Sequence, residues 1–303
     1  MNEGVENMKD SLDKSSSISL GWKEFSILFK SRVVGLLLLA SIGGAFLAEN
    51  GVPDWKLILI LVVVGGLSAS GSGALNEYLE KDSDALMTRT KLRPLVVGSF
   101  EHPIWVPYVS ILMILVPSLV VMFFNIELAV FLLSGAFIYV IVYTLWLKPR
   151  TILNIVIGGA SGSAAVLSGS AVVGIWNDPG AIVLAALLFS WTPMHFWSLA
   201  VVCRDDYFSS NTPMLPVYLS IRQSSWWIMI HTLVTVFAAL CLSILPGLGV
   251  FYFYPILVVS IAVLYQNIRL IMYPTVNEAR RLFHGSNIYL ALVILLVCLN
   301  IAF

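Results

Sequence analysis

Long apolar runs separated by short polar breaks dominate the chain and predict its elements. A bilayer core needs roughly 20 mostly apolar residues per helix. The predicted spans are residues 33–49, 57–76, 104–124, 127–147, 152–175, 180–202, 226–246, 251–272 and 286–302. Fusion of two runs across one of the shorter breaks, such as Asn125-Ile126-Glu127, would reduce the nine helices to eight. The pattern predicts an all-α integral membrane protein.

The composition supports this fold class. The chain has 303 residues, of which 59% are hydrophobic and 11% charged, and its mean hydropathy of +0.91 excludes a soluble globular domain. The net charge of zero gives no reason to expect a nucleic-acid partner. Residues 1–24 are polar and lack the apolar core of a secretory signal, so we expect a disordered cytosolic tail followed by one membrane domain, residues 25–303.

The positive charges predict the orientation in the bilayer, because loops on the cytosolic side retain Lys and Arg. All of the 17 Lys and Arg residues except Lys56 fall on one side when the nine spans alternate. The short turns on the other side contain acids instead, at Glu49, Asp54, Glu127 and Asp178. We therefore expect a multi-pass protein of the cell (plasma) membrane, with the N-terminus in the cytosol and the C-terminus outside.

A polar face emerges from the apolar second span. Asn76, Glu80 and Asp84 are spaced one helical turn apart, so each lies about 40° around the helix and about 6 Å further along it than the last. Asp82 points to the other side and Glu77 lies at the flank. Carboxylates at this spacing repel each other unless a cation lies between them.

Mg²⁺ is the cation that fits these ligands, because it prefers oxygen donors, keeps waters and binds substrate phosphates. Arg89 and Arg93 follow the face and can take further phosphate charge through bidentate hydrogen bonds. The alternative interpretation is a solvated helix end whose basic residues obey the positive-inside rule. That alternative explains the arginines better than it explains the acids emerging from the span.

A second candidate group lies at the end of the sixth span. His195 and Asp206 are eleven residues apart, so on one continuous helix they share a face about 16 Å apart, with His195 near mid-membrane. A neutral histidine bonded to a neighbouring hydroxyl or carbonyl is the alternative for His195. Trp191, Phe196 and Trp197 are candidates for the wall of a flat ligand site, although aromatic residues also pack helices.

Further residues on the same predicted side complete the candidate site. Ser209 and Ser210 follow Asp205 and Asp206 at one-turn spacing, so no second carboxylate pair forms there. A diphosphate needs neutralising charge from several directions, and the other candidates are Lys30, Arg32, Lys148 and Arg150, with Asn154 one turn inside the fifth span. The glycines after Asn154 favour close helix packing.

Several spaced motifs resemble one family. The segment "NEYLEKDSDALMTRTKLRPL" is similar to the first signature of the UbiA superfamily of membrane prenyltransferases, in its heme O synthase (protoheme IX farnesyltransferase) form. The segments "YTLWLKPRT" with "NIVIGG", "HFWSLA" and "DDYFSSNTPMLPV" match further parts of that family. The resemblance runs from about Phe25 to Tyr289.

The resemblance implies a fold and a reaction. It implies nine helices around a central cavity capped by the loops after the second and sixth spans. It also implies that Mg²⁺ and basic residues draw diphosphate from farnesyl diphosphate, and that a vinyl group of heme B attacks the allylic cation to give heme O. A heme A synthase is then a candidate partner.

By position, the resemblance assigns Asn76, Glu80, Asp84 and Asp206 to the metal, with Arg89 also catalytic, and His195 to heme contact. The substrate-binding positions are Lys30, Arg32, Arg93, Lys148, Arg150 and Asn154. The chain departs from the pattern at Glu77 and Glu80, where the superfamily usually has Asp, and at Ser210, which replaces an acid. A proline that relatives often have between Lys30 and Arg32 is also missing.

Two other functions fit parts of this sequence. A prenyltransferase of the same superfamily with another aromatic or lipid acceptor would share the metal dependence but not a need for His195. A small-anion transporter would place ionisable residues through both halves of the membrane, whereas the outer halves have almost none apart from His231.

Overall fold

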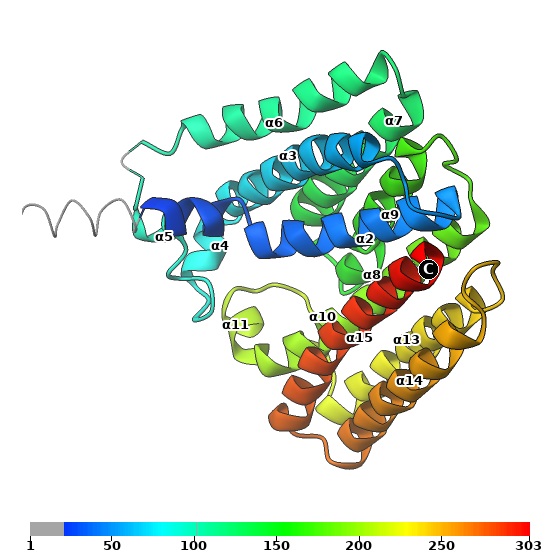
Figure 1. The fold of residues 1–303 in the computed structure, drawn as a ribbon. Helices are drawn as coiled ribbons and strands as arrows, with labels where there is room; N and C mark the ends of the chain where they lie inside the picture. The colour runs from blue at the N-terminus through cyan, green and yellow to red at the C-terminus, as the bar shows by residue number, and fades with distance from the viewer. Residues whose placement is uncertain (1–20, 101) are drawn as a thin grey trace, which may run out of the picture.

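The computed structural model describes residues 21–100 and 102–303, and within these ranges it contains helices and no strand (Figure 1). Nine of its helical segments are long and apolar enough to cross a bilayer, which confirms the predicted count over the described part of the chain. They are α2 (Ser31–Glu49), α3 (Trp55–Leu79), α6 (Trp105–Met122), α7 (Ile126–Phe137) continued by the π-helix η1 (Ile138–Leu147), α8 (Asn154–Gly158) with α9 (Ala160–Val172), α10 (Pro179–Val202), α13 (Ile221–Leu242), α14 (Gly249–Met272) and α15 (Val276–Ala302).

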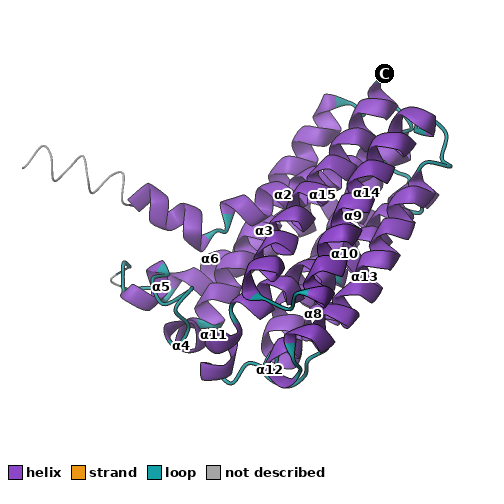
Figure 2. Ribbon diagram, turned by 90° about the horizontal axis from the view of Figure 1, so that it is seen from below, coloured by secondary structure: helices purple, strands orange, loops and turns teal. Residues whose placement is uncertain are grey.

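Four short helices gather at one end of the bundle, opposite the C-terminus (Figure 2). They are α4 (Lys81–Ala85), α5 (Pro94–Val97), α11 (Arg204–Ser209) and α12 (Leu215–Tyr218), and together with their loops we call them the cap. The cap is built from the loops after the second and sixth spans, as expected. Which side of the membrane it faces stays a prediction.

Several boundaries differ from those expected, and two of the differences have a clear basis in the structure. The last span begins ten residues before the predicted start because Thr275 caps α15, its hydroxyl oxygen accepting the N–H of Glu278 at 3.3 Å. Residues 21–28 are helical, so the last four residues of the predicted tail, residues 21–24, belong to a helix. The rest of that tail lies outside the described residues.

α2 and α10 contact each other in the middle of the bundle. α2 also contacts α3, α9 and α15, and α10 also contacts α9, α13 and α15. The backbones of α2 and α9 approach closely, and a Cβ atom on Gly169 would overlap the carbonyl oxygen of Ser41. Ser41 itself donates to the carbonyl of Ala165 at 2.6 Å. Small residues allow such backbone contact in membranes, where apolar burial drives helix association less than in water. The large exposed apolar side chains belong mostly to the spans, as expected for surfaces that meet lipid.

We expect Gly169→Ala to destabilise the protein and Gly35→Ala to leave it unchanged or slightly more stable. Both glycines lie in spanning helices, but a Cβ at Gly35 has nothing within 4 Å. Alanine favours a helix by up to about 1 kcal/mol over glycine, whereas overpacking costs about 1–3 kcal/mol. Thermal unfolding in detergent compares the two variants, and equal melting temperatures would contradict the close α2–α9 contact.

Candidate functional site

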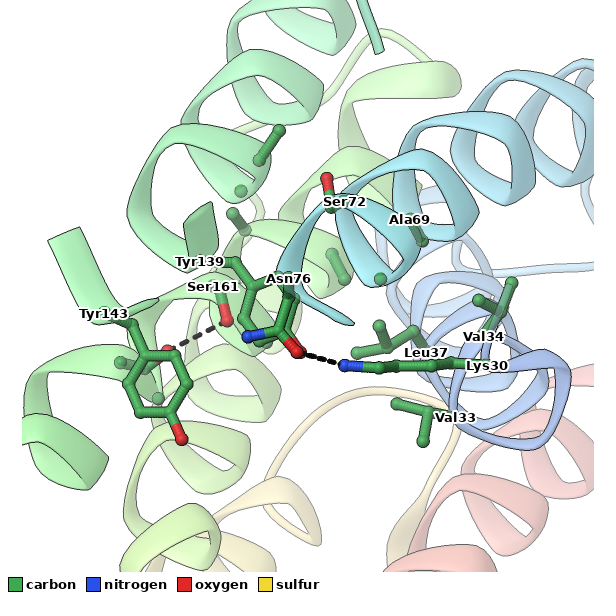
Figure 3. A pocket seen from close by; sticks show the side chains of 18 of the residues that line it. Lys30, Val33, Val34, Leu37, Ala69, Ser72, Asn76, Tyr139, Tyr143 and Ser161 are labelled. Atoms are coloured by element: carbon green, nitrogen blue, oxygen red, sulfur yellow. Dashed lines mark hydrogen bonds between the residues drawn. The ribbon is translucent and has the colours of Figure 1, made fainter. Parts of the chain in front are cut away.

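A cavity of about 360 Å³ lies between α2, α3, α7, η1, α9 and α10 (Figure 3), and the cap residues Arg89, Arg93 and Tyr207 line its mouth. Its depth is lined by apolar and small side chains such as Leu37, Leu132 and Ala165. The charged residues that line it all lie near the cap, and they are Lys30, Glu80, Arg89, Arg93 and Lys148. Four cations and one acid make this mouth positive, which favours an anionic group there. An apolar chain fits the depth.

The predicted polar face forms, but not on one unbroken helix. α3 ends at Leu79, and Glu80 has a non-helical backbone before α4 begins. The N–H of Glu80 still bonds to the carbonyl of Asn76 at 3.0 Å, and the N–H of Asp84 to that of Glu80 at 2.8 Å. These four-residue steps keep the three side chains on one side, while Asp82 is exposed as predicted.

Each of the three face residues is bonded to a different basic side chain. The amide oxygen of Asn76 accepts from Lys30 and the carboxylate of Asp84 from Arg93, and Glu80 accepts from Lys148 at 2.5 Å. Although burial alone would raise it, the pKa of Glu80 is lowered from its usual value because Lys148 lies beside it. The mouth therefore holds three oxygen acceptors, each bonded to a different cationic side chain.

Two of the cations, Lys30 and Lys148, come from segments with unusual backbone conformations. Lys30 has a φ of 50° just before α2, a left-handed conformation that is costly for a residue with a side chain. Its stem lies against Gly73, where an added Cβ would come within 3.2 Å of it. Burial, with the charge of Arg93 adding to it, lowers the pKa of Lys30 to about 7.

The π-helix η1 forms the wall opposite Lys30. π-Helical segments are rare and occur often at functional sites. The i→i+5 pattern continues to Lys148, whose N–H bonds to the carbonyl of Tyr143 at 2.8 Å, and the Lys148 ammonium lies 5.7 Å from the centre of the Tyr143 ring. Tyr139 stacks on Tyr143 with ring centres 5.8 Å apart, and its hydroxyl accepts from Lys30 at 2.9 Å.

Asp206 joins the two loops of the cap. Its carboxylate accepts the backbone N–H of Thr88 at 2.8 Å and that of Arg89 at 3.1 Å. Partial burial opposes ionisation, but these two donors hold the pKa of Asp206 below its usual value. Ser209 adds a bond to the carbonyl of Leu86 at 3.2 Å. Asp206 therefore fixes the backbone from which Arg89 reaches the cavity.

Three predicted substrate-binding residues are not brought to the cavity. Arg32 is exposed at the start of α2. Arg150 caps the end of η1 by donating to the carbonyls of Leu145 and Trp146. Asn154 is buried and donates to the carbonyls of Thr151 and Pro213, so it ties the start of α8 to the cap. Their sequence positions placed them at the correct end of the bundle, but their side chains are engaged elsewhere or point outward.

His195 lies behind the cavity wall instead of lining it. Its ring is stacked between Trp191, at 4.3 Å, and Phe283, at 4.6 Å, and its Nδ1 is 2.8 Å from the hydroxyl oxygen of Ser286. Trp191 and Phe196 line the cavity as the sequence suggested, whereas Trp197 is not among the residues that do. A contact between His195 and a heme stays a prediction.

Sequence reasoning missed three residues of this site and placed a fourth, Glu77, only at its flank. Tyr139 and Tyr143 line the cavity, and Thr144 bonds directly to Asn76. Their signal is a pair of polar positions, 139 and 144, five apart in an apolar span, which matches a π-helix and not an α-helix. Glu77 is fully buried, and neither of its carboxylate oxygens has a hydrogen-bond partner among the described residues. A buried carboxyl without a partner is costly, so Glu77 departs from the pairing of its neighbours Asn76 and Glu80.

The donor set fits a magnesium ion that is shared with a phosphate ligand. No group of three or more His, Cys, Asp or Glu residues suited to a metal occurs in the described ranges. Mg²⁺ does not need one, because it is usually bound by one or two carboxylates together with waters and substrate phosphates. Asn76, Glu80 and Asp84 supply an amide oxygen and two carboxylates next to a positive, anion-attracting mouth.

Comparisons with known proteins find one family. The model of the UbiA prenyltransferase family matches residues 36–297. A protoheme IX farnesyltransferase 2 of Paramagnetospirillum magneticum is 38% identical over 276 residues, which cover 90% of this chain and 94% of that one. A protoheme IX farnesyltransferase of Metallosphaera sedula is 39% identical over 287 residues, which cover 94% and 99% of the two chains.

Solved structures share the fold at low sequence identity. A digeranylgeranylglyceryl phosphate synthase superposes with a TM-score of 0.77 at 16% identity, covering 92% of this chain and 98% of its own. A UbiA homolog from Archaeoglobus fulgidus bound to GPP and Mg²⁺ gives 0.63 at 13% identity, covering 90% and 99%. Together they show that the described helices are arranged as in these two solved structures.

We expect Asp206→Ala to loosen the loop that carries Arg89. Loss of the carboxylate leaves the N–H groups of Thr88 and Arg89 without their acceptor, so trypsin should cut faster after Arg89 and Lys91. The matched control is Asp205→Ala, because Asp205 is exposed and makes no side-chain hydrogen bond in the described structure. Cleavage rates measured by mass spectrometry should rise only for the Asp206 variant. Equal rates would mean that this carboxylate does not hold the loop.

Proposed function

Because the chain belongs to the UbiA prenyltransferase family, we propose that it is a heme O synthase, which transfers a farnesyl group from farnesyl diphosphate to a vinyl group of heme B. The names of its 38–39% identical relatives support this donor and this acceptor. The observation that carries the proposal is the mouth of the cavity. There the side-chain oxygens of three residues on one segment accept hydrogen bonds from Lys30, Lys148 and Arg93, and the rest of the cavity is apolar.

The hydrogen-bonded pairs at the mouth can separate when a magnesium diphosphate binds, because the metal replaces the cations and the diphosphate replaces the oxygen acceptors. Asn76, Glu80 and Asp84 would hold Mg²⁺, and Lys30, Arg89, Arg93 and Lys148 would bind the diphosphate oxygens. A metal brings positive charge to the acids and a diphosphate brings negative charge to the bases, so the exchange keeps the buried charges paired. Magnesium, when bound, neutralises the charge that develops on the leaving diphosphate. Asp206, proposed from the sequence as a further ligand, contributes by placing Arg89.

The apolar depth of the cavity is where the farnesyl group would be transferred. When the bond between farnesyl C1 and the diphosphate oxygen breaks, C1 bonds to the terminal vinyl carbon of heme B. Water then adds to the other vinyl carbon and releases a proton, which gives the hydroxyethylfarnesyl group. Apolar walls keep water from the allylic cation before the acceptor attacks. The stacked rings of Tyr139 and Tyr143 lie beside the mouth, where a developing cation is stabilised by aromatic faces.

The distribution of charge favours an enzyme over a small-anion transporter. The charged side chains that line the cavity are confined to its mouth, whereas a transport path needs polar groups along its whole length. We place the protein in the plasma membrane with the cap in the cytosol. A heme A synthase that receives heme O is the partner proposed there.

The test uses purified protein with heme B, farnesyl diphosphate and Mg²⁺, and analyses the heme by mass. We expect a heme O product and diphosphate release that depends on Mg²⁺. Asp84→Ala should reduce diphosphate release by at least about 100-fold, the loss expected when a transition-state contact is removed. Asp82→Ala is the control, because Asp82 is exposed on the other side of the same helix. An unchanged heme mass with folded protein would overturn heme as the acceptor.

His195 separates the acceptor hypotheses. We expect His195→Ala to lower farnesyl transfer to heme B at least about tenfold, since its ring supports Trp191 in the cavity wall. Binding of farnesyl diphosphate should not change, because the mouth lies elsewhere. His231→Ala is the control, a histidine that contacts Trp197 away from the cavity. An enzyme that uses another aromatic or lipid acceptor should be indifferent to His195→Ala. Normal transfer to heme B in both variants would overturn the role of His195 at this wall.

A further inference from the structure

A chain of three hydrogen bonds fixes which way the amide of Asn76 points. The hydroxyl of Thr144 donates to the carbonyl of Tyr139 at 2.8 Å. The amide nitrogen of Asn76 donates to the same hydroxyl oxygen at 2.9 Å. The amide oxygen of Asn76 accepts from the ammonium of Lys30. Asn76 is 2% exposed and Thr144 6% exposed, so neither group can turn to water for a substitute partner.

The chemistry at both ends leaves one arrangement. A carbonyl only accepts, so the single proton of the Thr144 hydroxyl must go to Tyr139, and Thr144 presents lone pairs to Asn76. Asn76 must therefore offer its NH₂ group to Thr144. At the other end a lysine ammonium only donates, so Asn76 must offer its oxygen to Lys30. Figure 3 shows this oxygen directed at Lys30 and the amide nitrogen on the opposite side.

The π-helix makes the first bond of this chain possible. Thr144 and Tyr139 are five residues apart, the spacing of the hydrogen bond in a π-helix. In an α-helix a threonine hydroxyl bonds to the carbonyl three or four residues earlier, as Thr192 and Thr232 do here. The π-helical turn moves the acceptor of Thr144 to residue 139 and leaves its lone pairs facing α3.

We propose that Thr144 is a positioning residue that keeps the oxygen of Asn76, and not its NH₂ group, directed toward the magnesium diphosphate. The inference rests on the proposed function of the mouth, but not on the identity of the acceptor. Mg²⁺ binds oxygen ligands, and a flipped amide would present two N–H donors to the cation. Partners that orient metal ligands in this way typically affect metal affinity by 10–100-fold.

The test measures metal binding without heme. Protein with farnesyl thiodiphosphate, an unreactive donor analogue, is titrated with Mn²⁺ in place of Mg²⁺, and free Mn²⁺ is followed by electron paramagnetic resonance. We expect Thr144→Val, which has the same shape but no hydroxyl, to weaken Mn²⁺ binding at least tenfold. Thr144→Ser keeps the hydroxyl and should bind within about threefold of wild type. Melting temperatures show that each variant is folded.

A double substitution separates orientation from general stability. In Asn76→Asp both side-chain ends are oxygens, so orientation no longer matters. Adding Thr144→Val to that variant should therefore change Mn²⁺ affinity by less than about threefold, even if it lowers the melting temperature. An equal loss in both backgrounds, or no loss from Thr144→Val alone, would overturn the inference. Failure of heme to react would leave these results unaffected, whereas wild-type protein that binds no Mn²⁺ would overturn both the metal site and the role of Thr144.

Discussion

The rest of the structure depends on one constraint, the need to match buried cations at the mouth of an apolar cavity with oxygen acceptors. An uncompensated ion there would cost several kcal/mol. Three side chains at and just after the end of α3 present oxygen acceptors. Each is bonded to a cation from a different segment: Lys30 before α2, Lys148 after η1 and Arg93 before α5. The helices that carry these residues must converge on one point, so the pairing fixes the arrangement of the mouth.

The same pairing gives the site its chemistry. Residues that neutralise one another within the protein are also complementary to a salt of a divalent metal and a polyanion. Binding such a salt replaces these internal pairs by external ones, so the charges of the paired residues stay compensated. The apolar depth adds what a prenyl chain needs, and the stacked aromatic pair borders the region between the two. In a site of this kind the charged groups bind at the mouth, and the apolar prenyl chain binds in the depth of the same cavity.

Much of this organisation could be predicted from the sequence. Hydrophobic run length predicted all nine spans over the described residues, because the bilayer imposes that length on each helix. One-turn spacing predicted the face of Asn76, Glu80 and Asp84, and it survived the helix break at Glu80 because the hydrogen bonds there keep the four-residue step. The positive charges identified the end of the bundle that carries the site.

Other features depend on tertiary contacts that a pattern does not contain. The charge of Arg150 places it near the mouth, but only the structure shows that it caps η1. His195 satisfied the sequence rule for a functional intramembrane residue, yet it lies behind Trp191. The π-helix escaped prediction because its apolar residues fit an α-helical period equally well, and with it Thr144 and the two tyrosines were missed. The role of Asp206 as a metal ligand stays a prediction, but only the structure shows that its carboxylate accepts backbone N–H groups of the other cap loop.

The most direct test of the central claim is a structure of the protein with Mn²⁺ and farnesyl thiodiphosphate, in which anomalous scattering locates the metal. The account predicts a metal at the mouth with oxygens of Asn76, Glu80 and Asp84 among its ligands, directly or through one water. It also predicts that Lys30, Lys148 and Arg93 turn from those residues to the diphosphate. A metal and diphosphate bound elsewhere, with the three internal pairs intact, would contradict it.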